Sequence, residues 1–222
     1  MQFPQRLIDG YSAFLSDRLP LEQSRFRELA ETGQHPEIMV IGCCDSRVSP
    51  EVIFDARPGE LFVVRNVANI VPPYAPDGQA HGVSAAIEFG LEGLKVKHIV
   101  VLGHARCGGV KAFAEEAAPL SPGDFIGKWM KLMQPAAEKT SRGSLSPSDY
   151  ITQLELANIV NSLNNLKTFP RLAAMIEKGE IATHGAYFGV VSGDLSVLDR
   201  DSGKFRRVAP EAHAKAFATP RF

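Results

Sequence analysis

The sequence has little net charge and no long apolar run. Its 222 residues contain 24 lysines and arginines against 25 aspartates and glutamates, which gives a net charge of -1. This balance lacks the positive charge of a nucleic-acid-binding domain or of a protein drawn to an anionic membrane. The longest apolar run, around Ile99 to Gly103, is far shorter than the roughly 20 residues of a transmembrane helix. Because the N-terminal residues also lack the basic and apolar segments of a secretory signal, we expect a soluble, cytoplasmic protein with no nucleic-acid or membrane partner.

Cysteine is scarce as well. The chain has three cysteines, Cys43, Cys44 and Cys107. An odd number in a protein expected to be cytoplasmic argues against a disulfide framework, and the lack of a C-x-x-C pair argues against a thiol redox protein. The three sulfurs are therefore expected to be buried, reactive or metal-bound.

The order of the predicted elements along the chain predicts an α/β fold. Alternating strands and helices predict a mostly parallel central β-sheet flanked by helices. Short runs rich in branched apolar side chains predict buried strands over residues 37–42, 61–64 and 96–103. Periodicity and glycine boundaries predict helices over residues 82–90, 108–116, 125–133, 150–166 and 170–178. Two further strands, expected over residues 187–191 and 195–198, flank a Ser-Gly-Asp turn and predict a hairpin at the end of the sheet.

Two more helices, over residues 4–16 and 21–31, are predicted before the first strand. In the first of them, four apolar side chains recur at helical spacing: Leu7, Tyr11, Phe14 and Leu15. We expect one domain over residues 1–222, with an N-terminal helical arm (1–34) and an α/β core (35–222), because 45% hydrophobic content suffices for one core. The arm packs either on a neighbouring subunit or on its own core, and both alternatives stay open.

Two polar segments follow predicted strands directly: Cys43 to Arg47 and His104 to Gly109. In open α/β sheets, ligands bind at the carboxyl ends of the strands, and that edge can bring together groups some sixty positions apart. Cysteine thiolates and histidine imidazoles are the ligands that zinc prefers in a tetrahedral site. A lone cysteine or histidine is usually a packed core residue, but the combination at two strand ends favours a metal site.

Cys43, His104 and Cys107 would supply three zinc ligands, and water or Asp45 would take the fourth position. Three protein ligands with one exchangeable position are typical of a catalytic zinc site. His104 would leave the strand and Cys107 would begin a helix. The amides of Gly108 and the next glycine would then lie near the Cys107 sulfur and favour its thiolate.

Several ordered blocks of the sequence resemble the β-class carbonic anhydrases, with motifs closest to the plant-type subgroup in a bacterial-like chain. They are Cys43 to Arg47 (CCDSR), Phe62 to Asn69 (FVVRNVAN) and Gly103 to Gly109 (GHARCGG), with Val71 to Tyr74 and Gly82 to Glu88 extending the likeness. The resemblance implies an enzyme for the reversible hydration of carbon dioxide to bicarbonate and a proton, acting as a homodimer or homotetramer. It also implies one Zn²⁺ per chain.

The resemblance assigns the site residues. Cys43, His104 and Cys107 would bind zinc, and Asp45 and Arg47 would form a catalytic dyad beside it. In a closed state Asp45 would become the fourth ligand, and in an open state it would pair with Arg47. Cys44 is interpreted as a non-ligand, because successive side chains on extended backbone point opposite ways, with a three-cysteine site as the alternative.

The implied mechanism uses zinc-bound hydroxide to attack carbon dioxide. Two thiolates cancel the charge of zinc, so the site should acidify water less than a three-histidine site does. Asp45 would compensate by accepting a hydrogen bond from that water, and Arg47 would keep Asp45 ionised. An ordinary structural ion pair is the alternative for this dyad.

The sequence departs from the family pattern in two places. Val40 stands where bacterial members with a regulatory bicarbonate site carry tryptophan, although Arg65 matches their arginine and their tyrosine falls near Tyr187 or Phe188. Bicarbonate regulation is therefore not expected. Arg57 stands where a glutamine often lines the substrate pocket, so either another group takes over the role of that glutamine or the pocket is more cationic.

The remaining interpretations concern the other histidines and two alternative functions. His98 is expected to be structural and His81 to begin a helix, whereas His35, His184 and His213 lack a matching partner. Proton relay near the surface is the alternative for these histidines. Hydrolysis of carbonyl sulfide or carbon disulfide is an alternative activity for the same site, disfavoured by the short tail from 211 to 222. A non-catalytic zinc-binding regulator is a second alternative, disfavoured because both members of the dyad are present.

Overall fold

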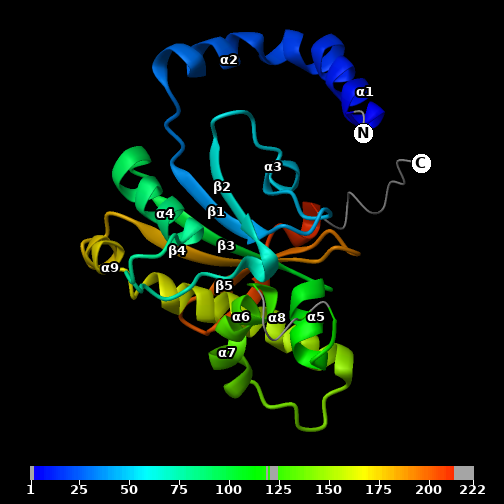
Figure 1. The fold of residues 1–222 in the computed structure, drawn as a ribbon, viewed down its shortest axis with the longest axis vertical. Helices are drawn as coiled ribbons and strands as arrows, with labels where there is room; N and C mark the ends of the chain where they lie inside the picture. The colour runs from blue at the N-terminus through cyan, green and yellow to red at the C-terminus, as the bar shows by residue number, and fades with distance from the viewer. Residues whose placement is uncertain (1–2, 119, 121–124, 213–222) are drawn as a thin grey trace.

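A mostly parallel sheet forms the centre of the molecule (Figure 1). The computed structural model describes residues 3–118, 120 and 125–212. Within them the strand order is β2-β1-β3-β4-β5-β6. β1 to β4 pair in parallel, and β5 and β6 extend the sheet antiparallel. The strands are β1 (Ile38–Cys43), β2 (Leu61–Asn66), β3 (His98–His104), β4 (Ala182–Phe188), β5 (Leu195–Asp199) and β6 (Lys204–Arg207).

Helices connect the strands and cover mainly one face of the sheet. They are α3 (Pro50–Ile53), the 3-10 turn η2 (Val67–Asn69), α4 (Gly82–Phe89) continued by η3 (Gly90–Leu94), α5 (Gly108–Glu115), α6 (Phe125–Met130), η4 (Lys131–Met133), α7 (Gln134–Glu138), α8 (Pro147–Leu166) and α9 (Pro170–Glu177). No helix in the described part of the chain is long and apolar enough to cross a membrane.

The main core lies between the sheet and helices α4, α8 and α9. Successive side chains on a strand point to opposite faces, so Met39 and Ile41 of β1 face these helices while Val40 faces away. Ile159 of α8 packs so closely on β3 that a Cβ added at Gly103 would lie 2.6 Å from its Cδ1 atom. This close approach requires glycine at the end of β3.

Helix α8 carries a polar stripe within this core. Asn158 Nδ2 donates to the carbonyl of Ala68 over 2.7 Å, and Ser162 Oγ accepts from the amide of Val71 over 3.1 Å. Ala68 adopts a left-handed conformation, with φ 64°, which is uncommon for a residue with a side chain. The stripe therefore supplies hydrogen bonds to an irregular segment that follows β2.

The other face of the sheet is less covered. Its buried residues are Val40, Leu102 and Ala186, and Ile53 of α3 is the helical side chain that packs on them within the described residues. A cavity of about 500 Å³ opens on this face, between Arg25 of the arm and the strands.

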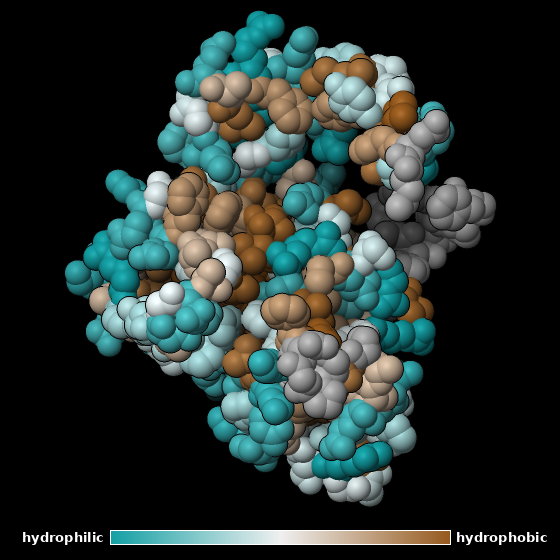
Figure 2. Space-filling model, in the orientation of Figure 1, coloured by the Kyte–Doolittle hydropathy of each residue, from teal (hydrophilic) through white to brown (hydrophobic). Residues whose placement is uncertain are grey.

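The N-terminal arm stands away from the body of the molecule (Figure 1). It consists of α1 (Gln5–Ala13), a π-helical turn η1 (Phe14–Arg18) and α2 (Leu19–Thr32), and none of its described residues is buried. Arg25 Nε donates to the carbonyl of Pro58 over 3.2 Å at the loop before β2. Figure 2 shows apolar surface both on the arm and on the body beneath it.

Most of the predicted elements are confirmed, and the structure differs from the expectations in three places. The strand expected over 187–191 is β4, which spans 182–188. Its start was missed because the Thr-His-Gly-Ala stretch lacks the apolar pattern of a strand. The short elements α3, α7 and β6 were not predicted, since four or five residues carry little periodicity, and α7 lies where a surface loop was expected. The two helices of the arm are joined without a break by η1. Residues 213–222 of the tail, and His213 with them, lie outside the described residues.

Candidate metal centre

Three side chains meet at the carboxyl edge of the sheet. Cys43 ends β1, His104 ends the neighbouring strand β3, and Cys107 immediately precedes α5. Their ligand atoms all lie within 4.8 Å of one another, and the two sulfurs are 4.0 Å apart. All three residues are at least 95% buried, with exposed fractions of 5%, 1% and 2%. The structure thus brings together the three residues that the sequence singled out.

His104 presents one ring nitrogen to this cluster. Its Nδ1 lies 3.0 Å from the carbonyl oxygen of Ala105, which can only accept, so Nδ1 carries the proton. The Nε2 atom is then an acceptor, and it is buried without a hydrogen-bond partner. A buried polar atom without a partner is rare, whereas a histidine metal ligand has this arrangement. The cluster therefore fits a metal ion.

The two thiols are held close enough to share a proton. Their mutual hydrogen bond lowers the pKa of the Cys43 thiol well below its usual value and raises the pKa of Cys107 far above it, with burial adding to the rise at Cys107. Metal binding requires both sulfurs as thiolates and releases such protons. A dication between the two sulfurs would replace the shared proton.

Backbone amides also stabilise the sulfurs. The amides of Asp45 and Ala68 lower the pKa of the Cys43 thiol, and those of Gly109 and Val110 act likewise on Cys107. Gly108 and Gly109 were expected in this last role. Cys107 is the N-cap residue of α5, so its sulfur lies near the first amides of that helix, and Val110 rather than Gly108 acts on its pKa together with Gly109.

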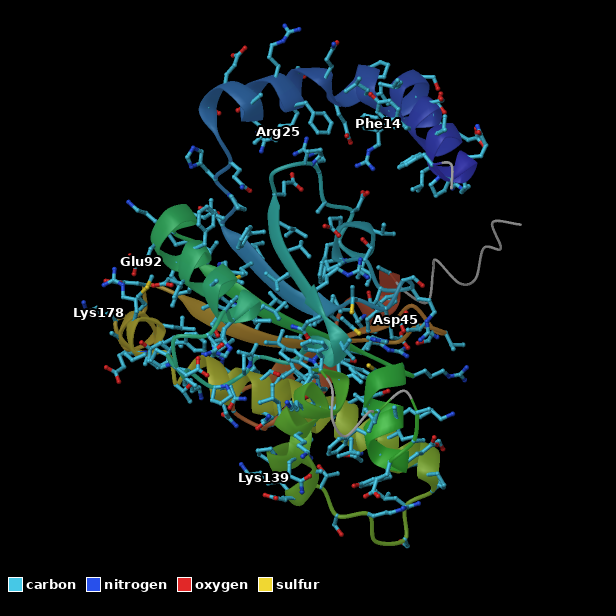
Figure 3. All side chains as sticks on the ribbon, in the orientation of Figure 1. Phe14, Arg25, Asp45, Glu92, Lys139 and Lys178 are labelled. Carbon is cyan, nitrogen blue, oxygen red and sulfur yellow. The ribbon has the colours of Figure 1, made fainter. Side chains whose placement is uncertain are left out.

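Asp45 and Arg47 form a bidentate ion pair beside the cluster, and Figure 3 labels Asp45 at this edge of the sheet. Arg47 Nε and Nη2 lie 2.9 and 2.6 Å from the two carboxylate oxygens of Asp45. The Arg47 guanidinium and backbone amide hold the pKa of Asp45 well below its usual range. Asp45 Oδ2 lies 4.0 Å from Nε2 of His104, so the carboxylate borders the place that a metal would take.

Arg65 anchors the loop that carries this pair. Its Nε donates to the carbonyl of Cys43 over 2.8 Å, and its Nη2 to the carbonyl of Asp45 over 2.7 Å. The sequence offered Arg65 only as a match to a regulatory arginine. Its backbone contacts were not predicted, since they depend on how β2 pairs with β1.

Glu155 is a buried residue of the site that sequence reasoning missed. It lies on α8 and is 3% exposed. Its Oε1 accepts from the Cys107 amide over 2.8 Å, and its Oε2 accepts from the Tyr187 hydroxyl over 2.7 Å. Burial raises the pKa of Glu155, although these two donors oppose the rise. A lone glutamate within the apolar face of a predicted helix was the one signal available.

The remaining candidates lie apart from the cluster. Cys44 is exposed and does not belong to the group of metal-ligand atoms. Arg57 is paired with Glu60 over 3.0 Å at the surface. His184 was expected to have no partner, but its Nε2 lies 3.2 Å from Nδ1 of His98, because β3 and β4 pair in a register that sequence does not show.

Comparison with known proteins decides the family. A family model described as carbonic anhydrase matches residues 38–195, which include every member of the cluster. This chain belongs to the β-carbonic anhydrase family. The carbonic anhydrase of Pseudomonas aeruginosa is 36% identical over 95% of this chain and 94% of its own length. Beta carbonic anhydrase 3 of Arabidopsis thaliana is 34% identical over 89% of this chain and 77% of its own length.

Solved β-carbonic anhydrases share the fold. The structure of the β-carbonic anhydrase CcaA matches with a TM-score of 0.82 and 31% identity, covering 91% of this chain and 98% of that one. The enzyme CafA of Aspergillus fumigatus matches with a TM-score of 0.75 and 31% identity, covering 96% and 95%. Carbonic anhydrases are lyases whose general reaction is the reversible hydration of carbon dioxide.

Proposed function

We propose that this chain hydrates carbon dioxide with one zinc ion held by Cys43, His104 and Cys107. The observation that carries the proposal is the partnerless Nε2 of His104, buried beside two thiols. Two thiolates and an imidazole form a donor set that binds zinc in preference to harder cations. When bound, zinc supplies the acidity that turns a water into hydroxide near neutral pH and so makes it a nucleophile for carbon dioxide.

Asp45 would accept a hydrogen bond from the attacking water and orient it. As a carboxylate it offers acceptors only, and its Oδ2 borders the metal position. Arg47 would fix that orientation, since it binds both carboxylate oxygens and also donates to the carbonyl of Arg106 over 3.0 Å. The pairing with Arg47 supports the open arrangement, in which Asp45 is not itself a ligand.

The direct test is stopped-flow carbon dioxide hydration by the purified protein, with zinc content measured per chain in reducing buffer. We expect one zinc per chain and a rate that disappears when a chelator removes the metal. Zinc without hydration would favour the non-catalytic zinc-binding alternative. A protein without zinc would contradict the proposal.

Activity should rise with pH, from about 7 to about 8.5, because a site with two thiolates acidifies water only moderately. Asp45 should contribute no step to this profile. Its pKa is depressed, so the carboxylate is ionised at every pH above that value, including the whole neutral range. Stopped-flow rates at constant ionic strength measure the profile, and a rate that stays flat between pH 6.5 and 9 would contradict it.

We also propose that the chain works as a homodimer or homotetramer in which the arm packs on a neighbouring subunit. The arm buries none of its own described residues, and Tyr11 is 61% exposed. The less covered face of the sheet offers apolar surface to match. Two β-carbonic anhydrases of Sordaria macrospora, one of which matches this chain with a TM-score of 0.72, are tetrameric.

Placing charge on the arm should weaken the assembly. In the double variant Tyr11→Asp, Leu15→Asp, two exposed apolar side chains become anionic, and we expect sedimentation equilibrium to show a smaller species than the wild type. Leu145→Asp places the same charge on an exposed apolar residue in the loop before α8, and it should leave the assembly unchanged. An arm variant that sediments like the wild type would argue that the arm does not hold the subunits together.

A further inference from the structure

The turn that carries two of the proposed ligands is strained. Between His104 and Cys107, Arg106 adopts a left-handed conformation with φ 58°. This region is disfavoured for residues with a Cβ atom and is occupied when surrounding contacts impose it. The position of the Cys107 sulfur therefore depends on the groups that hold the turn.

Three hydrogen bonds, each to a different part of the chain, hold this turn in place. The Ala105 amide donates to the carbonyl of Phe188 over 2.9 Å, and Arg47 Nη2 donates to the carbonyl of Arg106 over 3.0 Å. The Cys107 amide donates to Glu155 Oε1 over 2.8 Å. Of the side chains in these three contacts, that of Glu155 is the buried one, and it accepts directly from the backbone amide of a proposed ligand residue.

Tyr187 in turn holds Glu155. Its hydroxyl donates to Oε2 over 2.7 Å, so both carboxylate oxygens have a donor and the side chain has one orientation. The pair links α8, β4 and the turn between β3 and α5. Neither side chain lies among the three ligand residues, so the pair acts on the site through the backbone of Cys107.

We propose that Glu155 and Tyr187 are positioning residues for the metal centre: they hold the Cys107 turn so that its sulfur faces Cys43 and His104. This inference rests on the proposed function, because it concerns the geometry of the proposed zinc site. Groups that orient metal ligands from behind typically contribute 10- to 100-fold, roughly, in metal affinity or activity.

Three variants distinguish a positioning role from a general loss of stability: Glu155→Ala, Glu155→Gln and Tyr187→Phe. Alanine leaves the Cys107 amide without its acceptor. Glutamine keeps an oxygen for that amide and an N–H for the tyrosine oxygen. Asn161→Ala is the matched control, because Asn161 is also on α8, is 9% exposed, and donates to the carbonyl of Leu132, away from the turn.

The readouts are the zinc Kd, by competition with a chromophoric chelator, and the thermal midpoint of each metal-free protein. We expect Glu155→Ala to weaken zinc binding by about 10- to 100-fold, Tyr187→Phe by less, and Glu155→Gln to stay close to wild type. Asn161→Ala should lower the thermal midpoint and leave the zinc Kd unchanged. The absorption bands of the cobalt-substituted Glu155→Ala protein should also shift, since they report thiolate geometry.

Two outcomes would overturn the inference, and they are distinguishable. If wild type binds one zinc per chain and Glu155→Ala binds it equally well, the pair does not position the site, although the proposed function stands. If wild type binds no zinc, the proposed function fails and the positioning role falls with it. Weakened zinc binding in Glu155→Ala, restored in Glu155→Gln, supports the inference.

Discussion

Replacing Cys43 with serine is expected to abolish both zinc binding and carbon dioxide hydration. A serine hydroxyl is a poor zinc ligand at neutral pH, and two remaining ligands do not make a stable site. We expect zinc affinity to fall by more than about 100-fold and the hydration rate by roughly 1,000-fold. Metal analysis after dialysis and stopped-flow hydration measure the two losses on the same sample.

Cys44→Ser is the matched control for this experiment. It makes the same chemical change one residue along the chain, at an exposed side chain outside the cluster. It should keep one zinc per chain and nearly the full rate. If Cys44→Ser lost zinc while Cys43→Ser kept it, the proposed ligand set would be wrong, and loss in both would favour the three-cysteine alternative.

Asp45→Ala is expected to keep zinc and lose most of the turnover. The three ligands remain, but the group that orients the attacking water is gone. Positioned proton acceptors typically contribute about 100- to 10,000-fold, so we expect a fall of that order in kcat. Asp45→Asn keeps the shape and removes the charge, and it should fall nearly as far, because an amide nitrogen replaces one of the two oxygens that Arg47 binds.

Glu60→Ala controls for the loss of a carboxylate paired with arginine. Glu60 pairs with Arg57 over 3.0 Å, as Asp45 pairs with Arg47, but at the surface away from the cluster. Its removal should change neither zinc content nor rate. If Asp45→Ala lost its zinc, Asp45 would be an obligatory ligand, and the open arrangement would be incorrect.

The sequence predicted the part of the site that follows from strand ends. Cys43 and His104 end neighbouring parallel strands, and a thiol three residues after the histidine falls at a helix start, so their convergence could be inferred from local pattern alone. The pairing of Arg47 with Asp45 could also be inferred from the sequence, but the effect proposed for it there, keeping Asp45 ionised, needs one change. An aspartate is already ionised at neutral pH, so at that pH Arg47 would contribute mainly by orienting the Asp45 carboxylate.

The surroundings of the site could not be inferred in this way. Glu155 reaches Cys107 from 48 positions along the chain, and Arg65 reaches the carbonyl of Asp45 only because of the register of β2. The His98–His184 contact depends in the same way on the pairing of β3 with β4. Side-chain to backbone contacts across elements leave no periodicity in a sequence, whereas strands and helices do.

The position of α8 in the chain has a consequence for how the protein would acquire a metal at the proposed site. Cys43, His104 and Cys107 all precede Asn158 and Glu155, the side chains of α8 that hold the backbone around them. During synthesis, which runs from the N-terminus, the ribosome therefore releases all three proposed ligands before it releases the helix that holds the backbone around them. An ion bound at that moment would be held by ligands whose backbone is not yet fixed. Docking of α8 would then fix that backbone and bring the ligands into their final geometry.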